Sequence, residues 1–273
     1  MKLDDLGYAK SEGKRIPMSA NVKELQDEQS YTATHIDADV IAESDYVKGS
    51  PTIEATVIFI ISGGSRRERD YFHPIFIETG LRRIRIAFRS KEGQGLKPYE
   101  LKQLAEDFVN TSTFVSETRE HFQIEDGDII YLLQDVDEFG EIIKPYITAV
   151  SETSPIKWII SNPSFEVWLF YHYFDNPKPL KDGLALNERD RSNWLKEHLN
   201  KIIPGGIQPT KALFQTKIAI QNSIKCYSET DGCPNVFCTQ MHHLAIAVAD
   251  AMGTELDDML KKRTEKIEKF RRK

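Results

Sequence analysis

The pattern in the sequence best suited to bind a metal ion is an acidic string, Asp135-Val136-Asp137-Glu138, which follows a run of apolar residues. If a β-strand continues through it, Asp135 and Asp137 point to the same side, because side chains alternate along a strand. Two like charges held close together are unfavourable unless a cation or a proton lies between them. Oxygen-only clusters of this kind suit magnesium, so Asp135, Asp137 and Glu138 are the predicted metal ligands. A solvated acidic turn at a helix N-terminus fits the same residues.

A second polar string, Ser161-Asn162-Pro163, precedes a helical pattern. We expect Ser161 or Asn162 to cap that helix, with Pro163 in its first turn. Glu166 lies one position off the apolar stripe of the helix, and we expect it at the same end of the sheet as Asp135. A capped core helix with an exposed glutamate is the alternative.

Ligands bind open parallel sheets at the carboxyl ends of the strands. Gly63, Asp135, Asp137 and Glu166 each close or follow a predicted strand. We therefore expect these four residues to surround one cleft.

Basic side chains follow the glycine turn at positions 63–64. Arg66, Arg67 and Arg69 are predicted to hold phosphate groups, and a solvated basic helix face is the alternative. The chain also ends on a basic stretch, residues 261–273, which suits either a phosphate-bearing partner or a solvated helix end.

The elements that must position these residues alternate along the chain. Apolar, β-branched runs without polar alternation indicate strands covered on both faces, as in parallel sheets. Each of these strand-like runs is followed by a helical pattern. The pattern after the second run is a long amphipathic helix from about residue 98 to 119, and the sequence after residue 164 reads as helical. The predicted strands are residues 56–61, 82–89, 128–134 and 155–160. We predict an α/β fold with a mainly parallel sheet, helices on both faces and a helical C-terminal part.

Composition narrows the class of protein. A net charge of −6 gives no sign that the whole molecule binds nucleic acid. No apolar run approaches the roughly 20 residues of a membrane span, and no signal segment is visible. Cys226, Cys233 and Cys238 are an odd number of thiols, which indicates reduced cysteines and a cytoplasmic protein. Their spacing matches no zinc pattern, although His242 and His243 follow closely.

Three strings together resemble the RloB-like family. They are residues 57–64 with Glu68, Tyr71 and Phe72 after them, then residues 134–138, and then the most specific one, Ser-Asn-Pro-Ser-Phe-Glu-Val-Trp at 161–168. Residues 233–239 are loosely similar to a further family segment. The resemblance implies a Toprim-like α/β core, which we place at residues 53–175, between an N-terminal extension (1–52) and a helical C-terminal region (176–273).

The same resemblance implies a function. Family members are Toprim-related and accompany ATPases and restriction-type defence genes. The implied activity is that of a nuclease dependent on magnesium or manganese, acting on RNA or DNA, with tRNA among the substrates to consider. The implied partners are an ATPase and nucleic acid, without a membrane, and a homodimer is left open.

One departure from the family pattern bears on activity. Gly63 stands where the family has a glutamate before glycine, and Arg67 stands where it has a threonine. That glutamate is the expected general acid/base or a metal contact, and glycine can be neither.

Two hypotheses follow. In the first, a nuclease uses Asp135 and Asp137 to hold the metal, and Glu68 and Glu166 complete the catalytic site. In the second, a catalytically degenerate subunit uses the same surface to bind nucleic acid or a protein.

Overall fold

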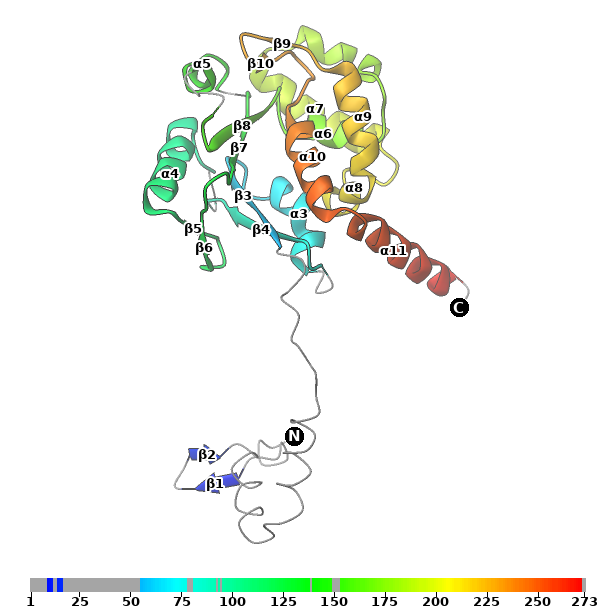
Figure 1. The fold of residues 1–273 in the computed structure, drawn as a ribbon. Coiled ribbons are helices and arrows are strands. Elements are labelled where there is room, and N and C mark those ends of the chain that lie inside the picture. The colour runs from blue at the N-terminus through cyan, green and yellow to red at the C-terminus, as the bar shows by residue number, and fades with distance from the viewer. Residues whose placement is uncertain are drawn as a thin grey trace. The chain divides into compact units, whose positions relative to one another are not determined.

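The computed structural model describes residues 9–11, 14–16, 55–77, 81–91, 93, 95–137, 139–148 and 153–271 (Figure 1). The chain divides into two compact units, Met1–Thr52 and Ile53–Lys273. In the first, β1 (Ala9–Ser11) and β2 (Lys14–Ile16) pair antiparallel. The rest of the predicted N-terminal extension lies outside the described residues. All elements named below belong to the second unit.

A four-stranded parallel sheet forms the centre of the second unit. Its strands are β3 (Thr56–Ser62), β4 (Ile84–Arg89), β7 (Ile130–Asp135) and β8 (Ile156–Ser161), in the spatial order β4-β3-β7-β8. Every neighbouring pair is parallel. The apolar, β-branched runs thus form the buried strands that their composition favours, and the predicted α/β fold is confirmed.

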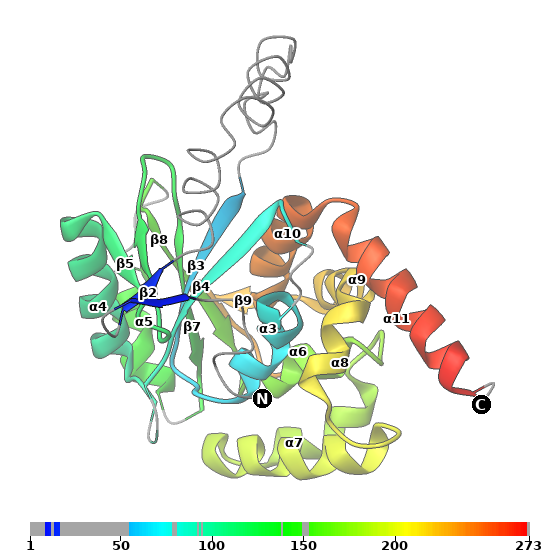
Figure 2. The same cartoon turned by 90° about the horizontal axis from the view of Figure 1, so that it is seen from below.

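Helices cover both faces of this sheet, as Figure 2 shows. On one face α4 (Pro98–Thr111) and α5 (Gly140–Thr148) enclose a core that includes alternate residues of β3 and β7. On the other face α3 (Arg67–Ile77), α6 (Glu166–Tyr171) and α10 (Met241–Met252) enclose a larger core. With both faces buried, the polar groups of the sheet are concentrated where the strands end.

The prediction of one long helix from residue 98 to 119 is wrong for the second half of that range. α4 ends at Thr111, and Ser112 follows in the left-handed conformation with φ 49°. A hairpin of β5 (Thr113–Val115) and β6 (His121–Gln123) comes next. Because Thr113 and Val115 are β-branched, this segment favours strand over helix.

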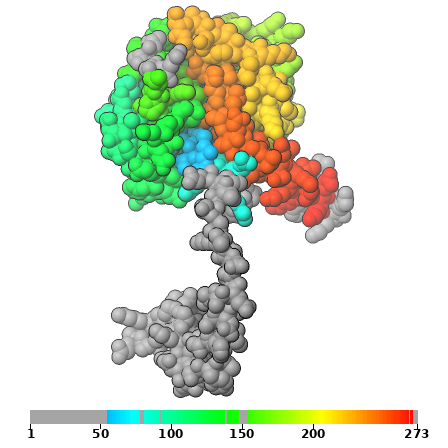
Figure 3. Space-filling view, viewed as in Figure 1, coloured from blue at the N-terminus to red at the C-terminus, as the bar shows by residue number. Residues whose placement is uncertain are grey.

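The C-terminal part is helical, as predicted, but more interrupted than the sequence pattern indicates. Residues 209–226 form three consecutive helical pieces, and the helix that follows them begins only at Met241. The remaining elements are η2 (Lys178–Ala185), α7 (Glu188–Ile202), α8 (Pro209–Ala212), η3 (Leu213–Gln215), α9 (Thr216–Cys226), β9 (Glu229–Thr230), β10 (Cys233–Pro234) and α11 (Glu255–Arg271). In Figure 3 the orange side chains of α10 lie directly against the sheet and its helices. No helix of the described residues is long and apolar enough to cross a membrane.

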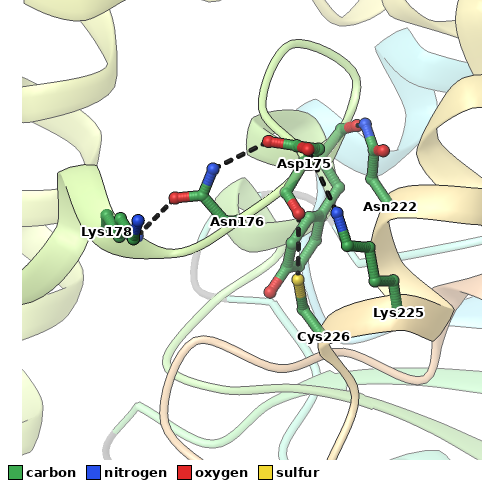
Figure 4. Close-up of polar contacts among 7 residues, drawn as sticks. Asp175, Asn176, Lys178, Asn222, Lys225 and Cys226 are labelled. Carbon is green, nitrogen blue, oxygen red and sulfur yellow. Dashed lines mark hydrogen bonds and ion pairs between the residues drawn. The ribbon is translucent and has the colours of Figure 1, made fainter.

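Polar contacts join the end of α6 to α9 (Figure 4). The Asp175 carboxylate accepts hydrogen bonds from Asn176 Nδ2 at 2.7 Å and from Lys225 Nζ at 3.1 Å. The Cys226 thiol donates to the Asp175 carbonyl, and Asn222 Nδ2 donates to the Tyr171 carbonyl at 2.9 Å. All three cysteines are free thiols, as their odd number predicts.

A buried histidine joins α6 to α3 and α9. His172 is 2% exposed, and its Nδ1 lies 2.9 Å from the Trp168 carbonyl, which can only accept, so Nδ1 carries the proton. Its Nε2 faces the Tyr71 hydroxyl at 3.3 Å, and that hydroxyl lies 2.7 Å from Thr216 Oγ1. Burial lowers the pKa of His172 from 6.5 to about 3.

We expect this histidine to make the fold acid-sensitive. The unfolded chain takes up a proton at His172 below pH 6.5, whereas the folded chain does so only near pH 3. Stability contributed by the neutral ring is therefore lost as the pH falls through that window, by about 1.4 kcal/mol per pH unit. Denaturant unfolding as a function of pH measures it. His172→Gln should lower stability overall but flatten the acid slope, whereas an unchanged slope would contradict the assignment.

Candidate functional site

A cleft of about 550 Å³ lies at the carboxyl ends of β3 and β7. Its walls come from the loop after β3, the loop between β4 and α4, the start of α4, and the turn after β7. The lining residues used below are Gly63, Gly64, Lys91, Gly95, Lys97, Tyr99, Gln134, Asp135 and Asp137. The predicted convergence thus holds for Gly63, Asp135 and Asp137, whereas Glu166 does not line the cleft.

The floor of the cleft is backbone packed too closely for side chains. Gly63 N–H donates to the Leu133 carbonyl at 2.8 Å, and the Gly63 carbonyl accepts from Leu96 N–H at 3.1 Å. A Cβ on Gly63 would meet Gln134 Oε1 at 2.6 Å, and one on Gly95 would collide with the Gly63 carbonyl. Glycine at position 63 therefore fits a close approach between the loop and β7.

The two aspartates reach the cleft differently from what strand alternation predicts. β7 ends at Asp135, and Asp137 has φ 23°, so the strand does not continue through it. Asp137 is held in the turn by its N–H, which donates to the Pro163 carbonyl at 2.9 Å. The backbone N–H of Phe165, before the start of α6, favours the charged form of Asp135 and lowers its pKa. Burial, and then the neighbouring charge of Glu68, hold the pKa of Asp135 well above its ordinary value.

Glu68 lies underneath the glycine loop. It belongs to the first turn of α3, is 6% exposed, and its carboxylate lies against Gly64, in the space a Cβ would fill. Burial raises the pKa of Glu68, and the positive charges of Arg67 and Lys196 oppose that rise. Lys196, on α7, also acts on Asp135. Sequence reasoning missed Lys196, because nothing in its helical pattern distinguishes it from a surface lysine.

Glu166 is neither exposed nor free, which excludes the exposed-glutamate alternative. It is 2% exposed, forms an ion pair with Arg67, and accepts from the Ser164 hydroxyl at 2.5 Å. The predicted cap is wrong: α6 begins at Glu166 after a cis Asn162–Pro163 bond, and its N-cap position is Phe165. Asn162 Nδ2 instead donates to the Pro234 carbonyl at 2.8 Å.

The three arginines predicted to hold phosphates do not form one patch. Arg66 is exposed, whereas Arg67 points inward to Glu166. Arg69 pairs with Glu117 at 2.6 Å and lines a different cavity, alongside β4. The basic groups that do line the cleft are Lys91 and Lys97.

The described carboxylates alone do not fit a magnesium ion. Glu166 is taken by Arg67 and Ser164, and Gly63 brings no carboxylate. No group of three or more His, Cys, Asp or Glu in the described part of the chain could hold a metal ion. Glu138, the third predicted ligand, lies outside the described residues, so the set of Asp135, Asp137 and Glu138 stays a prediction.

The fold and the site define a class: a parallel α/β protein with acidic residues gathered at the carboxyl edge of its sheet. Within that class, the family model described as RloB-like protein matches residues 58–247, and the chain belongs to this family. The match spans the sheet and most of the helices packed on it. No curated protein and no solved structure matches the chain.

We expect Gly64 and Glu68 to be energetically coupled. Gly64→Ala should destabilise the fold by about 1–3 kcal/mol, because its methyl group displaces the Glu68 carboxylate. In a Glu68→Ala background the same change should cost much less, since the space is then vacant. Urea unfolding of the two single variants and the double variant measures the coupling. Equal costs in both backgrounds would show that Glu68 does not lie against the loop.

Proposed function

We propose that this RloB-like protein is a nucleic-acid-binding component of a bacterial defence system that does not itself cleave its substrate. The observation that carries the proposal is the cleft at the strand ends, with its backbone floor, its two lysines and its exposed tyrosine. Family membership supports the defence context. The proposal includes an ATPase partner, a cytoplasmic location and a homodimeric state.

Beside the carboxylates of Glu100, Asp135 and Asp137, the cleft carries groups that suit a nucleic-acid strand. Lys97 is exposed at the rim of the cleft. Lys91 lies on the same loop, and its Nζ forms an ion pair with Glu100 Oε1 at 3.2 Å. Ammonium groups bind phosphates, and side-chain-free glycine lets a sugar–phosphate chain approach the backbone closely. Tyr99 is 51% exposed, so its ring is free to stack on an unpaired base.

The missing carboxylate favours binding over cleavage. A positioned proton-transfer group typically contributes on the order of 10²–10⁴-fold to a reaction, and water cannot replace it. Gly63 has no such group, and a side chain added there meets Gln134. Glu166, another residue of the predicted catalytic set, is engaged by Arg67.

We expect Lys97 and Tyr99 to contribute to nucleic-acid binding. Lys97→Gln should weaken binding of single-stranded RNA or DNA and reduce the salt slope of the affinity by about one. Tyr99→Leu should cost about 1–3 kcal/mol through lost stacking. Fluorescence anisotropy with labelled oligonucleotides measures both effects. The matched control is Lys102→Gln, which removes a lysine of the same helix that pairs with Glu106 outside the cleft. Affinities equal to that of the control would place the binding surface elsewhere.

A metal-dependent nuclease is the second candidate, because Asp135 and Asp137 both line the cleft. Purified protein with its ATPase partner would be assayed on RNA and DNA with magnesium or manganese. Under the main proposal no cleavage is expected, and Asp135→Asn should change nothing in that assay. Cleavage that Asp135→Asn abolishes would establish the nuclease instead. Cleavage that survives the substitution would indicate a contaminating enzyme or another site.

A further inference from the structure

β4 is an outer strand of the sheet, and some of its backbone groups face away from β3. In a parallel pair, alternate residues of a strand bond to its neighbour. Because Thr56 N–H donates to the Arg83 carbonyl, the odd-numbered residues of β4 are the ones that bond to β3. The outward backbone groups are therefore those of Ile84, Ile86 and Phe88. Residues 84–88 are called the open edge below.

Neighbouring elements close the two ends of the open edge and leave its middle free. At the end of the strand, Glu117 N–H donates to the Phe88 carbonyl at 2.9 Å. Before its start, the Glu255 carboxylate accepts from two backbone N–H groups at 3.0 and 3.2 Å. Within the residues that the structure describes, no hydrogen bond reaches the outward N–H or carbonyl of Ile84 or Ile86. An additional strand pairs with unused donors and acceptors of this kind.

A cavity of about 570 Å³ lies along the open edge, between α3 and the β5–β6 hairpin. One wall is apolar, because Phe76 and Ile77 at the end of α3 are 38% and 63% exposed and lie beside the half-buried Ile86. On the opposite face of β4, the Arg85 guanidinium lies over the Phe122 ring at 5.0 Å. A strand added here would place its side chains alternately against the apolar wall and beside Arg85.

Arginine side chains make the open edge basic. The side chain of Arg85 is 57% exposed, and its ion pair with Glu120 spans 3.8 Å, longer than a hydrogen bond. Arg82 and Arg83, directly before the strand, are exposed, and in the described part of the chain no carboxylate pairs with their side chains. The edge therefore presents positive charge, although the net charge of the chain is −6.

These charges decide which kind of strand fits. A second copy of β4 would place arginines beside arginines, and like charges on neighbouring strands destabilise their pairing. Acidic side chains in the same positions would pair with Arg85. A nucleic acid would also be attracted by the charge, but it would leave the apolar wall and the strand-pairing groups unused.

We propose that the open edge of β4 binds an extended acidic segment of a partner protein as a fifth strand of the sheet. The backbone of that segment pairs with the outward groups of Ile84 and Ile86. Its apolar side chains pack against Phe76 and Ile77, and its acidic side chains face Arg85. The cleft at the carboxyl ends of β3 and β7 has different walls, so this inference does not rest on the proposed function.

A labelled peptide tests the inference on the full chain. The probe is as long as β4, alternates glutamate with valine, and is followed by fluorescence anisotropy at protein concentrations up to about 1 mM. Saturable binding is expected. A peptide with lysine in place of each glutamate should bind roughly tenfold more weakly or not at all, because its charges repel Arg85.

Methylated peptides test the backbone pairing. Only alternate amides of an added strand face β4, so one peptide is N-methylated at its valines and another at its glutamates. One of the two should lose at least about tenfold in affinity, because its donors to the open edge are gone. Methylation without effect in either peptide would show that the backbone does not pair, and would overturn the proposal.

Variants of the protein locate the binding surface. Arg85→Glu should weaken binding of the glutamate peptide roughly tenfold and strengthen binding of the lysine peptide. Ile77→Ser should also weaken the glutamate peptide. The matched controls are Lys201→Glu on α7 and Ile142→Ser on α5, both exposed outside the cavity, and they should bind as the wild type does. Circular dichroism checks the fold of each variant, and Arg85→Gln replaces Arg85→Glu if the latter does not fold.

Three outcomes would overturn the proposal. If no peptide binds, the arginines only protect the strand edge from aggregation. If the peptide binds the Arg85 and Ile77 variants as tightly as the controls, it binds elsewhere. If no peptide binds and single-stranded RNA or DNA binds in a way that Arg85→Glu weakens, the edge is a nucleic-acid surface.

Discussion

Like charges brought together at the end of a buried sheet are the constraint on which this structure depends. The charge of Glu68 raises the pKa of Asp135, so that ionising Asp135 beside Glu68 costs free energy, and neither residue is well exposed to water. Such a pair persists only if a proton, a positive charge or hydrogen bonds relieve the repulsion. The charges of Arg67 and Lys196 lower the pKa of Glu68, and Lys196 and the N–H of Phe165 lower that of Asp135, yet both pKa values stay raised.

This constraint makes the C-terminal helices part of the site. Lys196 belongs to α7. The turn that holds Asp137 is bonded to the Pro163 carbonyl, and the neighbouring Asn162 side chain donates to the Pro234 carbonyl in β10. The sheet supplies Asp135, whereas Glu68, Arg67 and Lys196 lie on helices. The sheet alone would therefore give an incomplete account of the charges around Asp135.

The sequence allows prediction of features that have a local physical cause. Continuous β-branched runs identify the four strands, and the rule that parallel strands end at one edge brings Gly63, Asp135 and Asp137 together. Pairings between distant segments leave no such local trace. The contact of Arg67 with Glu166 depends on how α3 and α6 pack, and the effect of the Lys196 charge on Glu68 depends on the position of α7. The same holds for Asn162, whose side chain bonds to a remote carbonyl instead of capping the next helix.

The segment around Thr239 shields an edge of the sheet. β8 is an outer strand, and its Ile160 N–H and carbonyl bond to Gln240, while Ser161 forms an isolated bridge with Thr239. Unpaired strand edges recruit other strands and lead to aggregation. The residues before α10 therefore cover the end of this strand edge, and a chain still emerging from the ribosome carries that end of β8 uncovered until those residues have been synthesised.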